Sequence, residues 1–210
     1  MTTSPSQPEP PALAAATAMF VEVLVVGIGT LAAGAPLLIA LIGPATTAKF
    51  VSAADSPLVA GAALATAYAL GILTDRAADT LLAPVRRRLR TRSFPSTSTY
   101  AQARLRLAEI PVFAAQADYA RSRMRICRGW LVNTVALTLT ANLALARYSF
   151  EHRLLVTAGA SALGLLTAVG FYRAWRSLTA TSYRKLAEQT TVTGSNPPVP
   201  AQPQPGPALP

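Results

Sequence analysis

Four long apolar runs limit what this chain can fold into. Residues 23–43, 58–74, 131–146 and 154–172 contain no Asp, Glu, Lys or Arg. As helices, runs of this length reach roughly 24–32 Å, close to the ~30 Å hydrocarbon core of a bilayer. Helices of a soluble bundle would carry polar residues every third or fourth position, and these runs do not. The sequence therefore predicts an all-α fold, an integral membrane four-helix bundle.

The basic residues predict how the spans are oriented. Residues 84–128 carry eleven arginines, no lysine and two acids, and Arg173, Arg176, Arg184 and Lys185 follow the fourth run. The other two loops hold only three basic residues between them. Because Lys and Arg concentrate in short cytoplasmic loops, both termini are predicted to be cytoplasmic, in a plasma membrane, with two inside–out–inside hairpins.

The predicted division of the chain follows from these spans. A disordered tail (1–18) without the basic residues of a signal peptide precedes the first transmembrane hairpin (19–83, spans about 20–43 and 58–82). A basic cytoplasmic helical linker (84–128) leads to the second hairpin (129–176, spans about 130–147 and 154–173). A cytoplasmic helix (177–192) and a disordered proline-rich tail (193–210) complete the chain.

Within the linker, local signals predict two helices. Thr99, with Gln102 three residues later, is typical of a capping box that begins a helix. That helix is expected to run to about Ile110, where Pro111 ends it. A second helix then runs into the third span. Aromatic residues near the span ends, among them Trp175, are expected at the lipid headgroups.

One set of ionisable residues is predicted to lie at a single depth, on the inner membrane face. It comprises Glu22, Asp75, Arg76, Asp79, Arg125 and Arg128. If the second span continues to residue 82, Asp75 lies inside the hydrocarbon and needs a counter-ion. Two interpretations remain open: ion pairs that join helix ends, or a cytoplasmic-side ion or proton site. The neighbouring arginines would repel cations and favour the first.

The third span carries a polar face made of Asn133, Thr134, Thr138 and Asn142. Such groups are costly against lipid, so the face is expected to turn inward and form interhelical hydrogen bonds, with pore lining as the alternative. Small residues on the other spans, such as Gly27 and Gly61, favour close helix packing.

No motif predicts catalysis. The sequence has no phosphate-binding loop, no Ser/His/Asp arrangement and no metal-ligand cluster, so we expect neither an enzyme nor a cofactor. Its preference for Arg over Lys is typical of a GC-rich bacterial genome. Anionic lipid headgroups account for the basic charge, and no nucleic-acid recognition motif is present.

These observations predict a small multi-pass membrane protein that acts as an assembly, accessory or regulatory subunit. Its partner would be a second copy or another membrane protein. The alternative is a small transporter or channel that uses the inner-face polar cluster.

Overall fold

The computed structural model describes residues 10–52, 56–148 and 151–195, and these ranges contain helices and no strand. Residues 1–9 and 196–210 of the two predicted tails lie outside these described residues. The helices are α1 (Pro10–Ile42), α2 (Pro44–Ser52), α3 (Pro57–Thr91), α4 (Thr97–Ala108), α5 (Pro111–Arg147) and α6 (Arg153–Ser195). The prediction of an all-α bundle is confirmed.

Four of these helices, α1, α3, α5 and α6, are long and apolar enough to cross a membrane. The most apolar stretch of each helix is mainly exposed. The buried share of its residues is 28% in α1, 17% in α3, 17% in α5 and zero in α6. In water, so much exposed Leu, Val and Ile would be unfavourable, whereas lipid tails are as apolar as these side chains. The chain is a multi-pass membrane protein.

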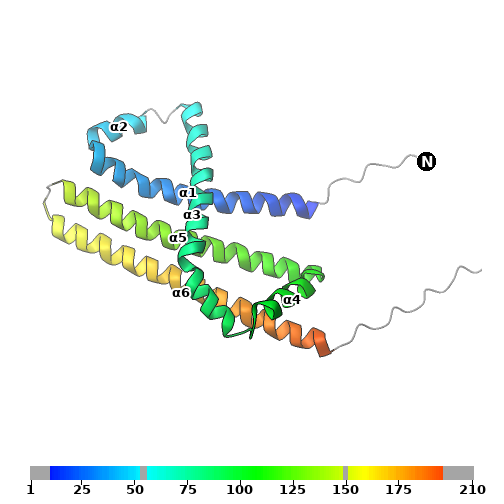
Figure 1. Cartoon of the computed structure of the whole chain (residues 1–210). Helices are drawn as coiled ribbons and strands as arrows, with labels where there is room; N and C mark the ends of the chain where they lie inside the picture. Colours follow the sequence, from blue (N-terminus) through cyan, green and yellow to red (C-terminus); the bar gives the residue numbers. More distant parts are fainter. Residues whose placement is uncertain (1–9, 53–55, 149–150, 196–210) are drawn as a thin grey trace, which may run out of the picture.

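The helices form a layer of three with a fourth across it (Figure 1). Helix α5 lies between α1 and α6 and contacts both, and α3 runs across α1 and α5 instead of alongside them. As a result the first part of α3 leaves the bundle, and residues 56–66 are all exposed. The beginnings of α1 and α5 and the end of α6 lie at one end of the layer (Figure 1).

Glycines allow α1 and α3 to cross at backbone contact. A Cβ atom on Gly27 would lie 1.6 Å from the carbonyl oxygen of Ala67, and one on Gly71 would lie 2.1 Å from the carbonyl oxygen of Val23. No side chain fits in either place. Of the small residues predicted to permit close packing, Gly27 does so at this crossing. Its partner on α3 is Gly71, whereas the predicted Gly61 has nothing within 4 Å.

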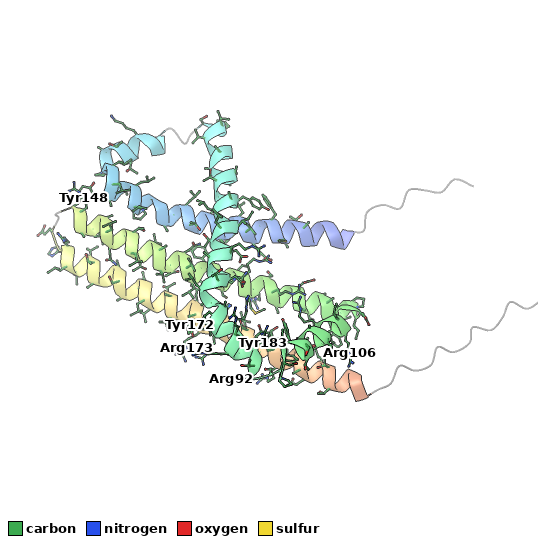
Figure 2. The ribbon with its side chains drawn as sticks, in the orientation of Figure 1. Arg92, Arg106, Tyr148, Tyr172, Arg173 and Tyr183 are labelled. Atoms are coloured by element: carbon green, nitrogen blue, oxygen red, sulfur yellow. The ribbon has the colours of Figure 1, made fainter. Side chains whose placement is uncertain are left out.

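The end of the bundle that carries most of the arginines forms a small folded unit, which we call the basic lobe. It consists of the end of α3, α4, the beginning of α5 and the end of α6. Its buried apolar side chains are Leu89, Phe94, Ala103, Leu107 and Trp175. The ring of Tyr100 packs edge-on against Phe94 and Tyr183, with centroid distances of 5.3 and 5.7 Å. Figure 2 places Arg92, Arg106 and Tyr183 in this lobe and Tyr148 at the opposite end of the bundle.

The lobe changes the environment of one aromatic residue. The sequence predicts Trp175 at the lipid headgroups, whereas its side chain is only 3% exposed. The prediction that it faces the headgroups is wrong, because protein covers this side chain, on a helix that packs against α3, α4 and α5. Trp175 therefore packs inside the protein.

Several helix ends also differ from the sequence prediction. Helix α1 begins at Pro10, within the tail predicted to be disordered to residue 18, and α3 continues through Pro84 to Thr91. Helix α4 has Ser96 as its N-cap, not Thr99: the Ser96 hydroxyl accepts a hydrogen bond from the Thr99 backbone N–H at 3.1 Å. Helix α6 is continuous from the fourth span to Ser195.

Candidate functional site

Ionisable side chains from three helices meet where α1, α3 and α5 enter the basic end of the bundle. We call this group the ionic cluster: Glu22 of α1, Asp75, Asp79 and Arg86 of α3, and Arg125 and Arg128 of α5. The three α3 residues are spaced by four and seven positions and therefore share one helix face. Because α3 is one unbroken helix here, Asp75 and Asp79 both face Arg128 of α5, and Arg86 pairs with Asp79.

Arg128 is the centre of the cluster. Its Nε atom donates to Oδ1 of Asp75 at 3.0 Å, and its Nη2 atom donates to Oδ2 at 3.0 Å and to Oδ1 at 2.8 Å. Its Nη1 atom donates to Asp79. The side chain of Arg128 is 18% exposed and that of Asp75 is 15% exposed. A planar guanidinium binds a carboxylate through two parallel hydrogen bonds, so this pair is strong and geometrically specific.

Glu22 connects the cluster to α1. Its carboxylate accepts hydrogen bonds from the Ser122 hydroxyl and, at 3.3 Å, from Nη1 of Arg125. The Nε atom of Arg125 also lies 3.9 Å from Asp75. On α3, Arg86 donates to Asp79. Three carboxylates thus face three guanidinium groups, and the formal charge of the cluster is zero.

The structure brings together five of the six residues proposed from the sequence. The exception is Arg76, which is exposed and lies about 100° around α3 from Asp75. Arg86 occupies the position in the ionic cluster that was predicted for Arg76. The seven-residue spacing from Asp79 to Arg86 is the signal that could have identified Arg86, and Ser122 lies one turn before Arg125.

The polar residues of α5 divide between two interfaces. Toward α1, the amide Nδ2 of Asn133 donates to the carbonyl oxygen of Val26 at 2.7 Å, and its Oδ1 accepts from the Thr30 hydroxyl at 2.9 Å. Thr30 also shares a 2.9 Å hydrogen bond with Thr74 of α3. This buried group therefore joins α1, α3 and α5 one layer deeper than the ionic cluster.

The opposite side of α5 faces α6. Asn142 and Ser161 exchange hydrogen bonds at 3.0 and 3.2 Å. Thr138 occupies the space beside Gly164, where a Cβ atom would lie 2.0 Å from the Thr138 hydroxyl. Thr134 is buried, and its carbonyl accepts from Thr138 at 2.7 Å. The four residues thus do not form one face: Asn133 and Asn142 lie about 180° apart around the helix.

This arrangement suits the joining of helices better than the binding of a small molecule or ion. Each carboxylate of the cluster already accepts from at least one arginine. Among the described residues, no group of three or more His, Cys, Asp or Glu side chains could hold a metal ion. Comparisons with protein-family models, curated proteins and solved structures find no match. Function must therefore be inferred from the geometry.

Proposed function

We propose that this protein is a non-enzymatic assembly subunit of the plasma membrane, which presents the first part of α3 to another membrane helix. The observation that carries the proposal is the exposure of residues 56–66 on every side, next to a crossing that fixes the rest of α3. The ionic cluster and the Asn133 group would then hold α3 rigid in the bundle. A rigid, projecting helix is a suitable element for assembly.

The exposed part of α3 has the composition of a helix-packing surface. Gly61, Ala65 and Ala69 repeat every fourth residue, and a Cβ atom on Gly61 would meet nothing within 4 Å. This face lies on the opposite side of α3 from Ala67 and Gly71, which are already occupied by α1. Small residues at four-residue spacing let two membrane helices approach closely.

The proposed orientation has both termini and the basic lobe in the cytoplasm. The lobe carries most of the basic residues of the chain, and anionic headgroups attract each nearby Arg by about 1 kcal/mol. Lipid attraction would thus hold the lobe against the membrane. Helix α2 and the short α5–α6 turn would lie outside.

Cysteine cross-linking in native membranes tests the assembly surface. In a Cys127→Ser background, which lacks the only natural cysteine, Gly61→Cys should form a disulfide-linked dimer or an adduct with a partner protein. Leu165→Cys is the matched control, because Leu165 is 66% exposed on α6, outside the proposed surface. Equal cross-linking at both positions, or none at Gly61→Cys, would contradict the proposal.

A further inference from the structure

A hollow in the basic lobe has the chemistry of a phosphate-binding site. It lies between the residues at the end of α3 and the second half of α6 and has a volume of about 380 Å³. The polar side chains that line it are Arg92, Ser93, Thr181, Arg184 and Glu188. We propose that this groove binds a phosphate group, carried by a lipid headgroup or by a soluble phosphate compound.

Two arginines that line the groove, Arg92 and Arg184, have guanidinium N–H groups without a hydrogen-bonded carboxylate among the described residues. Arg184 contacts Glu188 only at 3.8 Å, longer than a hydrogen bond, and both side chains are about two-thirds exposed. Within the described part of the chain, no carboxylate pairs with Arg92. The arginines of the ionic cluster differ, since each of them donates a hydrogen bond to a carboxylate.

The groups around these arginines complete a set of phosphate ligands. Arg92 and Arg184 supply forked N–H donors, which match phosphate oxygens in geometry. The hydroxyls of Ser93 and Thr181 add two neutral donors on the same lining. Glu188 is the single opposing charge, so it should weaken the binding of an anion.

The position of the groove allows either source of phosphate. The apolar run of α6 ends at Tyr172, and Thr181 lies nine residues beyond it, about 13 Å along the helix. The headgroup layer extends roughly 5–7 Å past the hydrocarbon. A long arginine can reach back to a headgroup, and the groove is also open to soluble phosphate.

Two binding measurements separate these sources. In the lipid arm, native mass spectrometry counts phosphatidylglycerol molecules retained by the full-length protein in detergent. In the soluble arm, inorganic phosphate is titrated against sodium chloride at constant ionic strength, and the melting temperature is followed. Retained lipid identifies a headgroup, and a phosphate-dependent rise identifies a soluble ligand.

Three variants decide whether the groove is responsible. Arg92→Gln and Arg184→Gln should each weaken binding about tenfold, as expected for a lost hydrogen bond to a charged group. Glu188→Gln should strengthen it. Arg121→Gln is the control, because Arg121 is exposed in the lobe outside the groove and pairs with Asp118. Binding that is equal in all variants, or lost equally with Arg121→Gln, would overturn the proposal, as would no binding in either arm.

Discussion

Arg128 of α5 and Asp75 of α3 form a bidentate ion pair between residues 53 positions apart in the sequence, with Nε on Oδ1 and Nη2 on Oδ2. The pair lies where α1, α3 and α5 meet and is mostly shielded from solvent. In such a place, removal of one partner leaves an uncompensated charge, which costs more than the pair itself contributes. Arg128 therefore provides the most direct test of the ionic cluster.

Arg128→Gln should destabilise the purified protein by about 3 kcal/mol, at the lower end of the range for a broken buried pair. Asp75 would lose its hydrogen-bonded counter-ion, with Arg125 3.9 Å away, and Asp79 would keep only Arg86. The free energy of unfolding in mixed micelles measures the effect. Arg121→Gln is the control: its pair with Asp118 is more than half exposed, and its loss should cost less than about 1 kcal/mol.

The double variant Asp75→Asn, Arg128→Gln tests whether the two residues act as a pair. Its destabilisation should be smaller than the sum of the two single effects by at least about 1 kcal/mol, since contacting charges couple. Additive effects would show that the cluster does not function through this contact. The same unfolding measurement applies.

The α1–α3 crossing predicts opposite outcomes for two glycines of one helix. Gly27→Ala forces a methyl group against the backbone of Ala67 and should cost about 1–3 kcal/mol, the usual range for overpacking. Gly34→Ala adds its methyl group where nothing lies within 4 Å, so stability should be unchanged or slightly higher. Equal effects of the two substitutions on the melting temperature would contradict this crossing.

The hydrogen bonds of Asn133 give a smaller prediction. Asn133→Ala removes one interhelical hydrogen bond to Val26 and one to Thr30. Each hydrogen bond in a membrane protein contributes about 0.6 kcal/mol on average, and the cavity left behind adds to the cost. The free energy of unfolding should therefore fall by about 1–2 kcal/mol. Thr167→Val is the control, because the exposed Thr167 hydroxyl bonds only to Leu163 of its own helix. The free energy of unfolding of both variants is measured in the same detergent. An equal loss of stability in Thr167→Val would contradict the role of the Asn133 hydrogen bonds.

The orientation is tested by reporter fusions. A reporter enzyme that is active only outside the cytoplasm should be active when fused after residue 50 or residue 150, and inactive when fused after residue 96. The reason is the excess of arginine in residues 84–128. A reporter that is active only when fused after residue 96 would contradict the proposed topology and indicate the opposite orientation.

The apolar runs alone predict the all-helical membrane fold, because length and hydropathy decide whether a helix can span a bilayer. The charges of Glu22, Asp75, Asp79, Arg125 and Arg128 also predict their meeting, since unpaired charges at this depth are costly. Two features could not be read in this way. The crossing of α3 depends on backbone approach at Gly27 and Gly71, and many glycines in the chain lack such a contact. The burial of Trp175 depends on the packing of α6 against helices that are distant in the sequence, which no local pattern encodes.

The residues of the ionic cluster are synthesised at different times. Glu22, Asp75 and Asp79 are synthesised before Arg125 and Arg128, and 49 residues separate Asp79 from Arg128. At about 5–20 residues per second, the ribosome needs roughly 2–10 s to produce this stretch. During that interval the nascent first half carries carboxylates without their α5 partners. A chain released before Arg125 would keep Glu22 and Asp75 without an arginine partner, and Asp79 would have only Arg86 of its own helix.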